Sequence, residues 1–134
     1  MQQIVQGKIK GIGYARAEIA GARNLEFNVP DPPFNNKKLR LAIAYALDKQ
    51  EIMQAAYFGL AETTDQRFPK GSIWYFDVPI PKYNLSKAKA LLKESGYNGE
   101  TLELMGNRGE VAEVEGATIQ AQLKKSALRL SSKS

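Results

Sequence analysis

The stretch PPFNNKKLRLAIAYALDKQEIMQAAYFG, residues 32–59, decides the fold, because no other part of the chain is so strongly patterned. Its first half has apolar residues at the spacing of one helix face, namely Leu39, Ala42, Ile43, Ala46 and Leu47. Asp48 interrupts this stripe, and Glu51 follows three residues later, as in a capping box. We therefore predict two helices in series, over about 36–47 and 49–58, with Asp48 as the N-cap of the second.

The residues around these two helices predict where they begin and end. Asn35 or Asn36 can cap the first helix through its short polar side chain. Gly59 supplies the left-handed residue that ends the second. Upstream, Asn24–Val29 alternates polar and apolar residues, which predicts a half-buried strand that stops at Pro30.

A long segment without a helical or strand pattern follows, over residues 60–83. It contains the single tryptophan of the chain, Trp74, within a run of four large apolar residues, Ile73 to Phe76. Two interpretations stay open at this point. The run packs into a local core, or it lines a binding surface or a neighbouring domain.

The last third of the chain predicts a helix, a strand and a second helix. Asn84 is the expected N-cap of a helix over 85–95 that ends at Gly96. Thr101–Met105 alternates and predicts a strand, and about 110–125 predicts a helix. The face of this helix that we expect to be buried comprises Val111, Val114, Thr118 and Ala121, widened by Ile119 and Leu123.

Composition limits the chemistry that the chain can perform. Its 134 residues include 19 basic and 14 acidic side chains but no histidine and no cysteine. Zinc fingers, cysteine–histidine pairs and serine–histidine–aspartate triads are thereby excluded. No apolar run approaches the roughly 18 residues of a membrane span, and the N-terminal residues lack the apolar core of a signal peptide. We expect a soluble chain with no metal site and no signal peptide of its own.

Residues 25–52, LEFNVPDPPFNNKKLRLAIAYALDKQEI, resemble the middle of the family 5 extracellular solute-binding proteins, the peptide- and nickel-type binding components of ABC importers. The residues that match in order are Asn28, Pro33, Phe34, Arg40, Ala42, Ala44, Ala46 and Asp48. A second signature resembles residues 81–92, PKYNLSKAKALL, in which Asn84 stands where the family has a capping aspartate. The resemblance extends over about 24–125.

The resemblance implies an α/β fold, the helix-rich part of one lobe of a type II periplasmic-binding-protein-like fold with a small sheet. We interpret residues 1–134 as a single domain, a partial lobe of a larger two-lobed protein. Residues 1–23 form a poorly defined lead-in near the hinge, 24–125 the family-like part and 126–134 a divergent tail. In the tail, Ser126–Leu130 replaces the Gly-Ile strand of the family, which we read as truncation, a frame shift or domain excision.

The function that the resemblance implies is that of a non-enzymatic substrate-binding component of an oligopeptide or dipeptide importer. The full-length protein would hold a peptide between two lobes, work with a membrane permease without a cofactor, and lie in the periplasm or outside the cell. Asn107 and Arg108 are the candidate ligand contacts because they follow the carboxyl end of a strand, and Trp74 is a weaker third. The residues to which we assign structural roles are Asn28, Arg40, Asp48 and Asn84.

Three alternatives accompany this reading. A small basic nucleic-acid-binding protein is disfavoured because the lysines are scattered over separate helices beside acids. An enzyme is disfavoured because the carboxylates, such as Glu110 and Glu113, fit helix starts better than acid–base pairs. A truncated remnant that binds nothing is the third. We also expect that a fragment with an uncovered face can form a homodimer.

Overall fold

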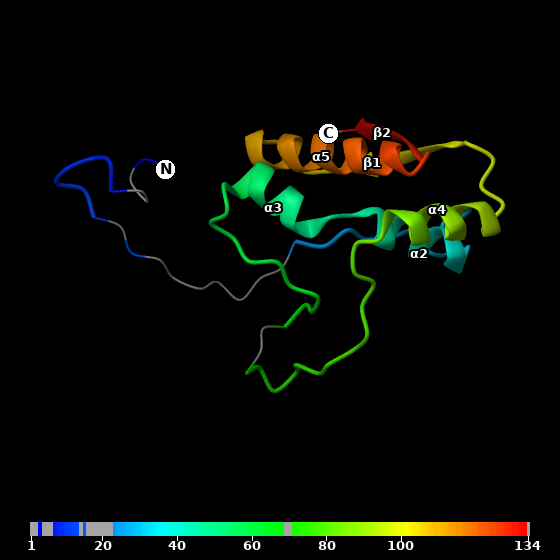
Figure 1. The fold of residues 1–134 in the computed structure, drawn as a ribbon, viewed down its shortest axis with the longest axis horizontal. Helices are drawn as coiled ribbons and strands as arrows, with labels where there is room; N and C mark the ends of the chain where they lie inside the picture. The colour runs from blue at the N-terminus through cyan, green and yellow to red at the C-terminus, as the bar shows by residue number, and fades with distance from the viewer. Residues whose placement is uncertain (1–2, 4–6, 14, 16–22, 69–70, 134) are drawn as a thin grey trace. The chain divides into compact units, whose positions relative to one another are not determined.

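The computed structural model describes residues 3, 7–13, 15, 23–68 and 71–133 (Figure 1). Its contacts divide the chain into a larger unit, Asn24–Thr63 with Asp77–Ser134, and a smaller unit, Met1–Arg23 with Thr64–Phe76. The elements of the larger unit are α2 (Lys37–Ala46), α3 (Lys49–Tyr57), α4 (Leu85–Glu94), β1 (Thr101–Met105), α5 (Glu110–Lys125) and β2 (Arg129–Lys133). The predicted order of elements is therefore confirmed for the first five of these segments, and β2 was not predicted.

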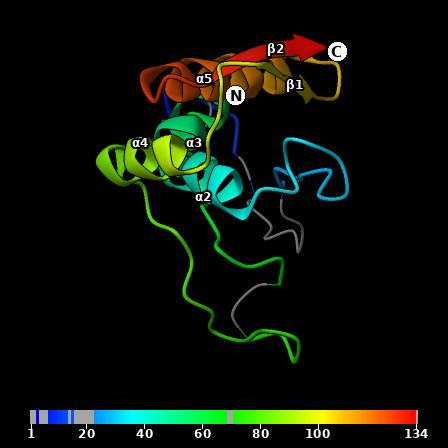
Figure 2. The same ribbon diagram turned by 90° about the vertical axis from the view of Figure 1, so that its right-hand side faces the viewer.

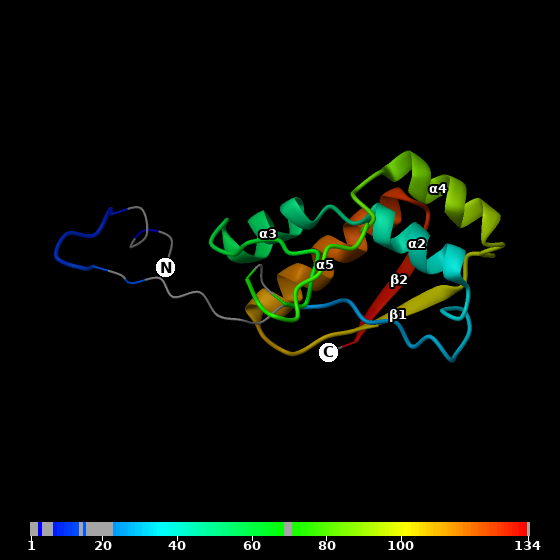
Figure 3. The same cartoon turned by 90° about the horizontal axis from the view of Figure 1, so that it is seen from below.

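The larger unit has two layers around one apolar core. Figures 1 and 2 show α2, α3 and α4 on one side and α5 with the two strands on the other. In Figure 3, α2 and α4 lie side by side. Their contact is close because it is made by small side chains: Ala42, Ala46 and Ala88 are almost completely buried. The remaining core residues are Leu39, Ile43, Leu92, Leu102, Leu123 and Leu128.

Asn36, and not Asn35, caps α2. Its side-chain oxygen accepts hydrogen bonds from the backbone N–H groups of Lys38 at 3.0 Å and Leu39 at 3.4 Å. The amide nitrogen of the same side chain donates to the carbonyl of Ser95, at 2.8 Å. Asn36 therefore caps the start of α2 and also connects it by a hydrogen bond to Ser95, the residue that follows α4.

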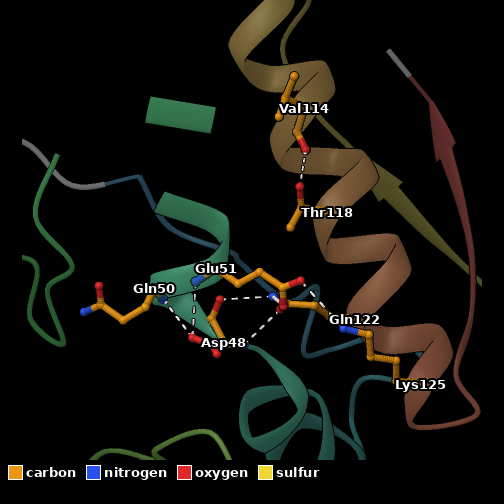
Figure 4. A network of polar contacts seen from close by, with 7 residues as sticks. All are labelled: Asp48, Gln50, Glu51, Val114, Thr118, Gln122 and Lys125. Carbon is orange, nitrogen blue, oxygen red and sulfur yellow. Dashed lines mark hydrogen bonds and ion pairs between the residues drawn. The ribbon is translucent and has the colours of Figure 1, made fainter. Parts of the chain in front are cut away.

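Asp48 connects α2 to α3, and its N–H, its carbonyl and one carboxylate oxygen all form hydrogen bonds (Figure 4). Its carboxylate caps α3, as predicted, by accepting from the N–H groups of Gln50 and Glu51 at 3.0 and 3.3 Å. In a capping box Glu51 would bind the N–H of Asp48. Here Gln122 of α5 does so instead, because its Oε1 accepts that N–H at 2.9 Å. Its Nε2 donates to the carbonyl of Asp48 at 3.1 Å and to Glu51 at 2.7 Å.

The end of α5 forms a Schellman motif that leads into β2. The N–H of Leu128 donates to the carbonyl of Leu123, and the N–H of Ala127 donates to that of Lys124, at 3.1 Å each. Ala127 has a φ of 71°, a left-handed conformation that favours glycine. The strand β2 then pairs in parallel with β1, with Thr101 opposite Arg129 and Met105 opposite Lys133. Part of the tail that we predicted to diverge from the family thus forms a regular strand.

Two predictions about local structure were wrong. Asn24–Val29 is not a strand, although Leu25 and Phe27 do pack against the core. A strand needs a hydrogen-bonded neighbour, and the single sheet in the described part of the chain consists of β1 and β2. The buried face of α5 also differs, because Ala121 is exposed and Gln122 is buried. That face meets the polar backbone of Asp48, which requires a hydrogen-bonding side chain rather than an apolar one.

The bonds of Gln122 predict a large effect of its removal. Gln122→Leu keeps the side-chain size but leaves the half-buried backbone N–H of Asp48 without its partner. It also removes one of the two hydrogen bonds that the Asp48 carbonyl accepts, the other coming from the N–H of Ile52. We expect a loss of about 2–3 kcal/mol in the free energy of unfolding, measured by urea denaturation followed by far-UV circular dichroism. Gln50→Leu removes an exposed glutamine hydrogen bond to Thr63 and should change stability by less than about 0.5 kcal/mol. Equal losses in both variants would contradict this account.

The left-handed backbone of Ala127 predicts that a glycine substitution at this position stabilises the protein. Ala127→Gly removes a Cβ from a left-handed residue and should raise the free energy of unfolding by about 1 kcal/mol. Ala90→Gly, at an exposed position in the interior of α4, is the matched control and should lower it by about 1 kcal/mol. Thermal and urea unfolding of the two variants test this, and a destabilised Ala127→Gly protein would refute the left-handed assignment.

Candidate functional site

The loop between β1 and α5, residues 106–109, carries two of the three candidate ligand residues. Met105 ends the strand, and Gly109 has a φ of 128°, which only glycine adopts without strain. The chain can therefore turn sharply before α5 begins at Glu110. Asn107 and Arg108 project from the centre of this turn and are exposed. Their position at the carboxyl end of a parallel strand agrees with the expectation from sequence.

The polar groups of this loop remain available to a ligand. Within the described residues, neither Asn107 nor Arg108 forms a hydrogen bond or an ion pair through its side chain. No side chain caps the start of α5. The first turn of α5 carries Glu110 and Glu113, which balance the partial positive charge of the helix end. The loop thus offers a guanidinium and an amide beside two carboxylates, a set suited to a ligand that has charges of both signs.

Trp74, the third candidate, lies in an exposed turn. The Oγ of Ser72 accepts the N–H of Trp74 at 3.2 Å, and the carbonyl of Ser72 accepts the N–H of Tyr75 at 3.0 Å. Trp74 is 64% exposed, and Ile73 and Phe76 are exposed as well. The core-packing interpretation of this run is therefore wrong for these three residues. Trp74 belongs to the smaller unit and the residues of the 106–109 loop belong to the larger, so the structure does not join the three candidates into one site.

The residues with assigned structural roles all make local bonds. Arg40 donates from Nη1 to the carbonyls of Phe34 and Asn35, at 2.6 and 3.1 Å. Asn28 donates to the carboxylate of Asp31 at 2.6 Å. Asn84 caps α4 by accepting from the N–H of Lys87 at 2.9 Å, and its own N–H donates to the carbonyl of Tyr45 at 2.8 Å. Each of these side chains is thus occupied in fixing a turn or a helix end.

Two shallow hollows occur in the larger unit, and neither is lined by a candidate ligand residue. One lies between Asn36, Ser95 and Glu100, and the other between Lys89, Lys93 and Arg129. The part of the chain that the structure describes contains no group of three metal-binding side chains. It also contains no helix with the length and hydropathy to cross a membrane.

Gln122 is the positioning residue that sequence reasoning missed. It holds the helix that follows the 106–109 loop against the α2–α3 joint. The one signal in the sequence was a polar residue beside Leu123 within the face that was expected to be apolar. In a helical pattern, a polar residue at this position indicates the edge of the buried stripe. The burial of Gln122 could therefore be recognised only once the position of the Asp48 backbone was known.

The comparison with known proteins assigns the chain to a family. Residues 2–133 match the family model described as bacterial extracellular solute-binding proteins, family 5 Middle. The probable ABC transporter periplasmic-binding protein SapA of Escherichia coli K12 is 40% identical over 82 residues, which is 60% of this chain and 15% of that protein. The chain therefore spans a small part of the length of the curated relatives that it matches.

Solved structures with the same fold also match. The ABC transporter substrate-binding protein CtaP of Listeria monocytogenes has a TM-score of 0.74 and 31% identity, over 80% of this chain and 23% of its own. The oligopeptide-binding protein AppA of Bacillus subtilis, solved with a nonapeptide, has a TM-score of 0.70 and 29% identity, over 80% of this chain and 25% of its own. The helices and the small parallel sheet thus form part of an α/β lobe, and the chain belongs to the family 5 bacterial extracellular solute-binding proteins.

Proposed function

We propose that the chain supplies part of one lobe of the substrate-binding component of an ABC importer, and that the whole protein captures a peptide between two lobes. The observation that carries the proposal is the pair Asn107 and Arg108, exposed and without side-chain partners in the described structure. The pair follows the carboxyl end of β1. In α/β proteins that end of a sheet is where ligands bind.

The chemistry of the loop favours a peptide. Arg108 presents a planar guanidinium that can hold a carboxylate with two parallel hydrogen bonds. The amide of Asn107 can both donate to and accept from a peptide unit, as a neighbouring strand would. Trp74, where the whole protein brings it to the ligand, offers a flat apolar surface for a side chain. None of these groups would act as a catalyst in this proposal.

The names of relatives suggest other solutes as well. Heme-binding protein A of Haemophilus influenzae is 39% identical over 75 residues, and the glutathione-binding protein GsiB of Pectobacterium atrosepticum is 37% identical over 86. Of the side chains that serve as axial heme ligands, the chain contains tyrosine and methionine but neither histidine nor cysteine. Glutathione is itself a small peptide with free carboxylates, so it belongs to the class proposed here. We place the whole protein outside the cytoplasmic membrane, with a membrane permease as its partner.

The assignment of Asn107 and Arg108 predicts the effect of their substitution. We expect unlabelled tetrapeptides to shift the amide NMR signals of residues 106–109 in the isotope-labelled chain. The two variants are made in the longest form of the protein that binds peptide. There, Arg108→Ala should weaken peptide binding about tenfold or more, as expected for the loss of a charged hydrogen bond. Asn107→Ala should weaken peptide binding less. Isothermal titration calorimetry with peptide, glutathione and heme as separate titrants provides the affinities.

Lys124→Ala is the matched control, because Lys124 is an exposed cation in the last turn of the same helix that the loop precedes. It should leave the affinity unchanged. Retention of full peptide affinity in the Asn107→Ala and Arg108→Ala double variant would remove these residues from the ligand site. Binding of heme but of no peptide would instead overturn the proposed ligand class.

A further inference from the structure

The positive charge of the chain is concentrated in the layer formed by α2 and α4. Residues 32–47 and 82–95 contain seven basic side chains and one acidic side chain, Glu94. Against totals of 19 basic and 14 acidic residues, this leaves 12 basic and 13 acidic side chains elsewhere. The formal net charge of +5 therefore comes entirely from this layer. The seven cations are Lys37, Lys38, Arg40, Lys82, Lys87, Lys89 and Lys93.

The structure brings several cations together around the second half of α4. Lys89 and Lys93 lie one turn apart and line the same hollow as Arg129, the first residue of β2. All three are exposed, and within the described residues their side chains form no ion pair. Lys38 of α2 reaches Glu94 at the end of α4, with 3.0 Å between Nζ and the carboxylate. We call Lys38, Lys89, Lys93 and Arg129 the basic face.

The acids near the basic face do not neutralise it. Glu94 is paired with Lys38. Glu100 lines the neighbouring hollow together with Tyr97, and its carboxylate accepts the N–H of Asn98 at 3.2 Å. Of the four cations, Lys89, Lys93 and Arg129 therefore have no ion pair within the described residues. Such charges act over roughly a Debye length, about 8–10 Å at physiological salt.

The ends of the neighbouring helices do not account for these cations. The carbonyls of Leu123 and Lys124 at the end of α5 already accept N–H groups from Ser126, Ala127 and Leu128. At the end of α4, the carbonyls of Leu91 and Leu92 accept the N–H of Ser95. Lys93 complements the dipole of its own helix end. Lys89 and Arg129 have no such role at a helix end.

The composition of the basic face distinguishes between classes of partner. Specific protein interfaces are depleted of lysine and depend on buried aromatic or arginine anchors. The basic face has three lysines, and no large apolar side chain on α2 or α4 is exposed. Lysine-rich surfaces without an apolar anchor are typical of attraction to anionic lipids. We propose that the basic face docks on an anionic phospholipid surface, an inference that does not depend on the ligand assigned to the 106–109 loop.

Vesicle co-sedimentation of the whole chain tests this proposal. At low salt the chain should bind vesicles made of equal parts of phosphatidylglycerol and phosphatidylcholine, and should not bind phosphatidylcholine alone. The triple variant Lys89→Gln, Lys93→Gln and Arg129→Gln should bind the anionic vesicles at least about tenfold more weakly, since each cation near such a surface contributes to affinity. Added salt should weaken binding of the unmodified chain.

The matched control is the triple variant Lys8→Gln, Lys10→Gln and Lys124→Gln, which loses the same charge at exposed positions outside the basic face. It should retain binding within about threefold, because loss of net charge alone has a smaller effect than loss of the contact face. Equal weakening in both triple variants would overturn the basic face as a docking surface. Failure to bind anionic vesicles while duplex DNA is bound at the same salt would also overturn it, in favour of nucleic acid.

Discussion

The paired hydrogen bonds between the side-chain amide of Gln122 and the backbone of Asp48 hold the two layers of the larger unit in register. Asp48 lies between α2 and α3, where its N–H has no partner within its own helix and its carbonyl also accepts the N–H of Ile52. From the opposite layer, the side-chain amide of Gln122 forms a hydrogen bond with each of these two groups and also donates to the carboxylate of Glu51. The Glu51 carboxylate in turn lies 3.6 Å from Nζ of Lys125 (Figure 4). Because the polar groups are satisfied as a set, the joint tolerates little sliding of α5.

This constraint places the loop that we regard as the ligand-facing part of the chain. The helix α5 begins directly after residues 106–109, and its other end leads through the Schellman motif into β2. The pairing of β2 with β1 then returns to the strand that precedes the same loop. Asn107 and Arg108 are therefore exposed side chains on a turn whose two flanks are anchored. Binding residues on loops supported by rigid elements are common in proteins, since the scaffold limits the freedom that a ligand would have to restrict.

Most of the helices could be predicted from sequence because local signals determine them. Asn36, Asp48 and Asn84 supply caps, and the apolar period of α2 predicts its buried face. Long-range partners could not be predicted. Leu25 and Phe27 have the alternating spacing of a strand, but their segment has no hydrogen-bonded neighbouring strand within the described residues. The run around Trp74 is apolar, but Ile73, Trp74 and Phe76 are exposed. The positions of Asn107 and Arg108 at a strand end were predictable, whereas the contact of Lys89 and Lys93 with a hollow beside Arg129 required the packed structure.

Amide hydrogen exchange at Asp48 tests the central claim most directly. The N–H of an N-cap residue that follows another helix has no partner in its own helix, so it normally exchanges quickly. In this structure it donates to the buried Gln122, whose side chain is 2% exposed. We predict that the Asp48 amide is protected as strongly as the core amides of α2, such as that of Ile43. Exchange as fast as that of the exposed Arg108 amide would contradict the account, because the two layers would then lack the bond proposed to hold them.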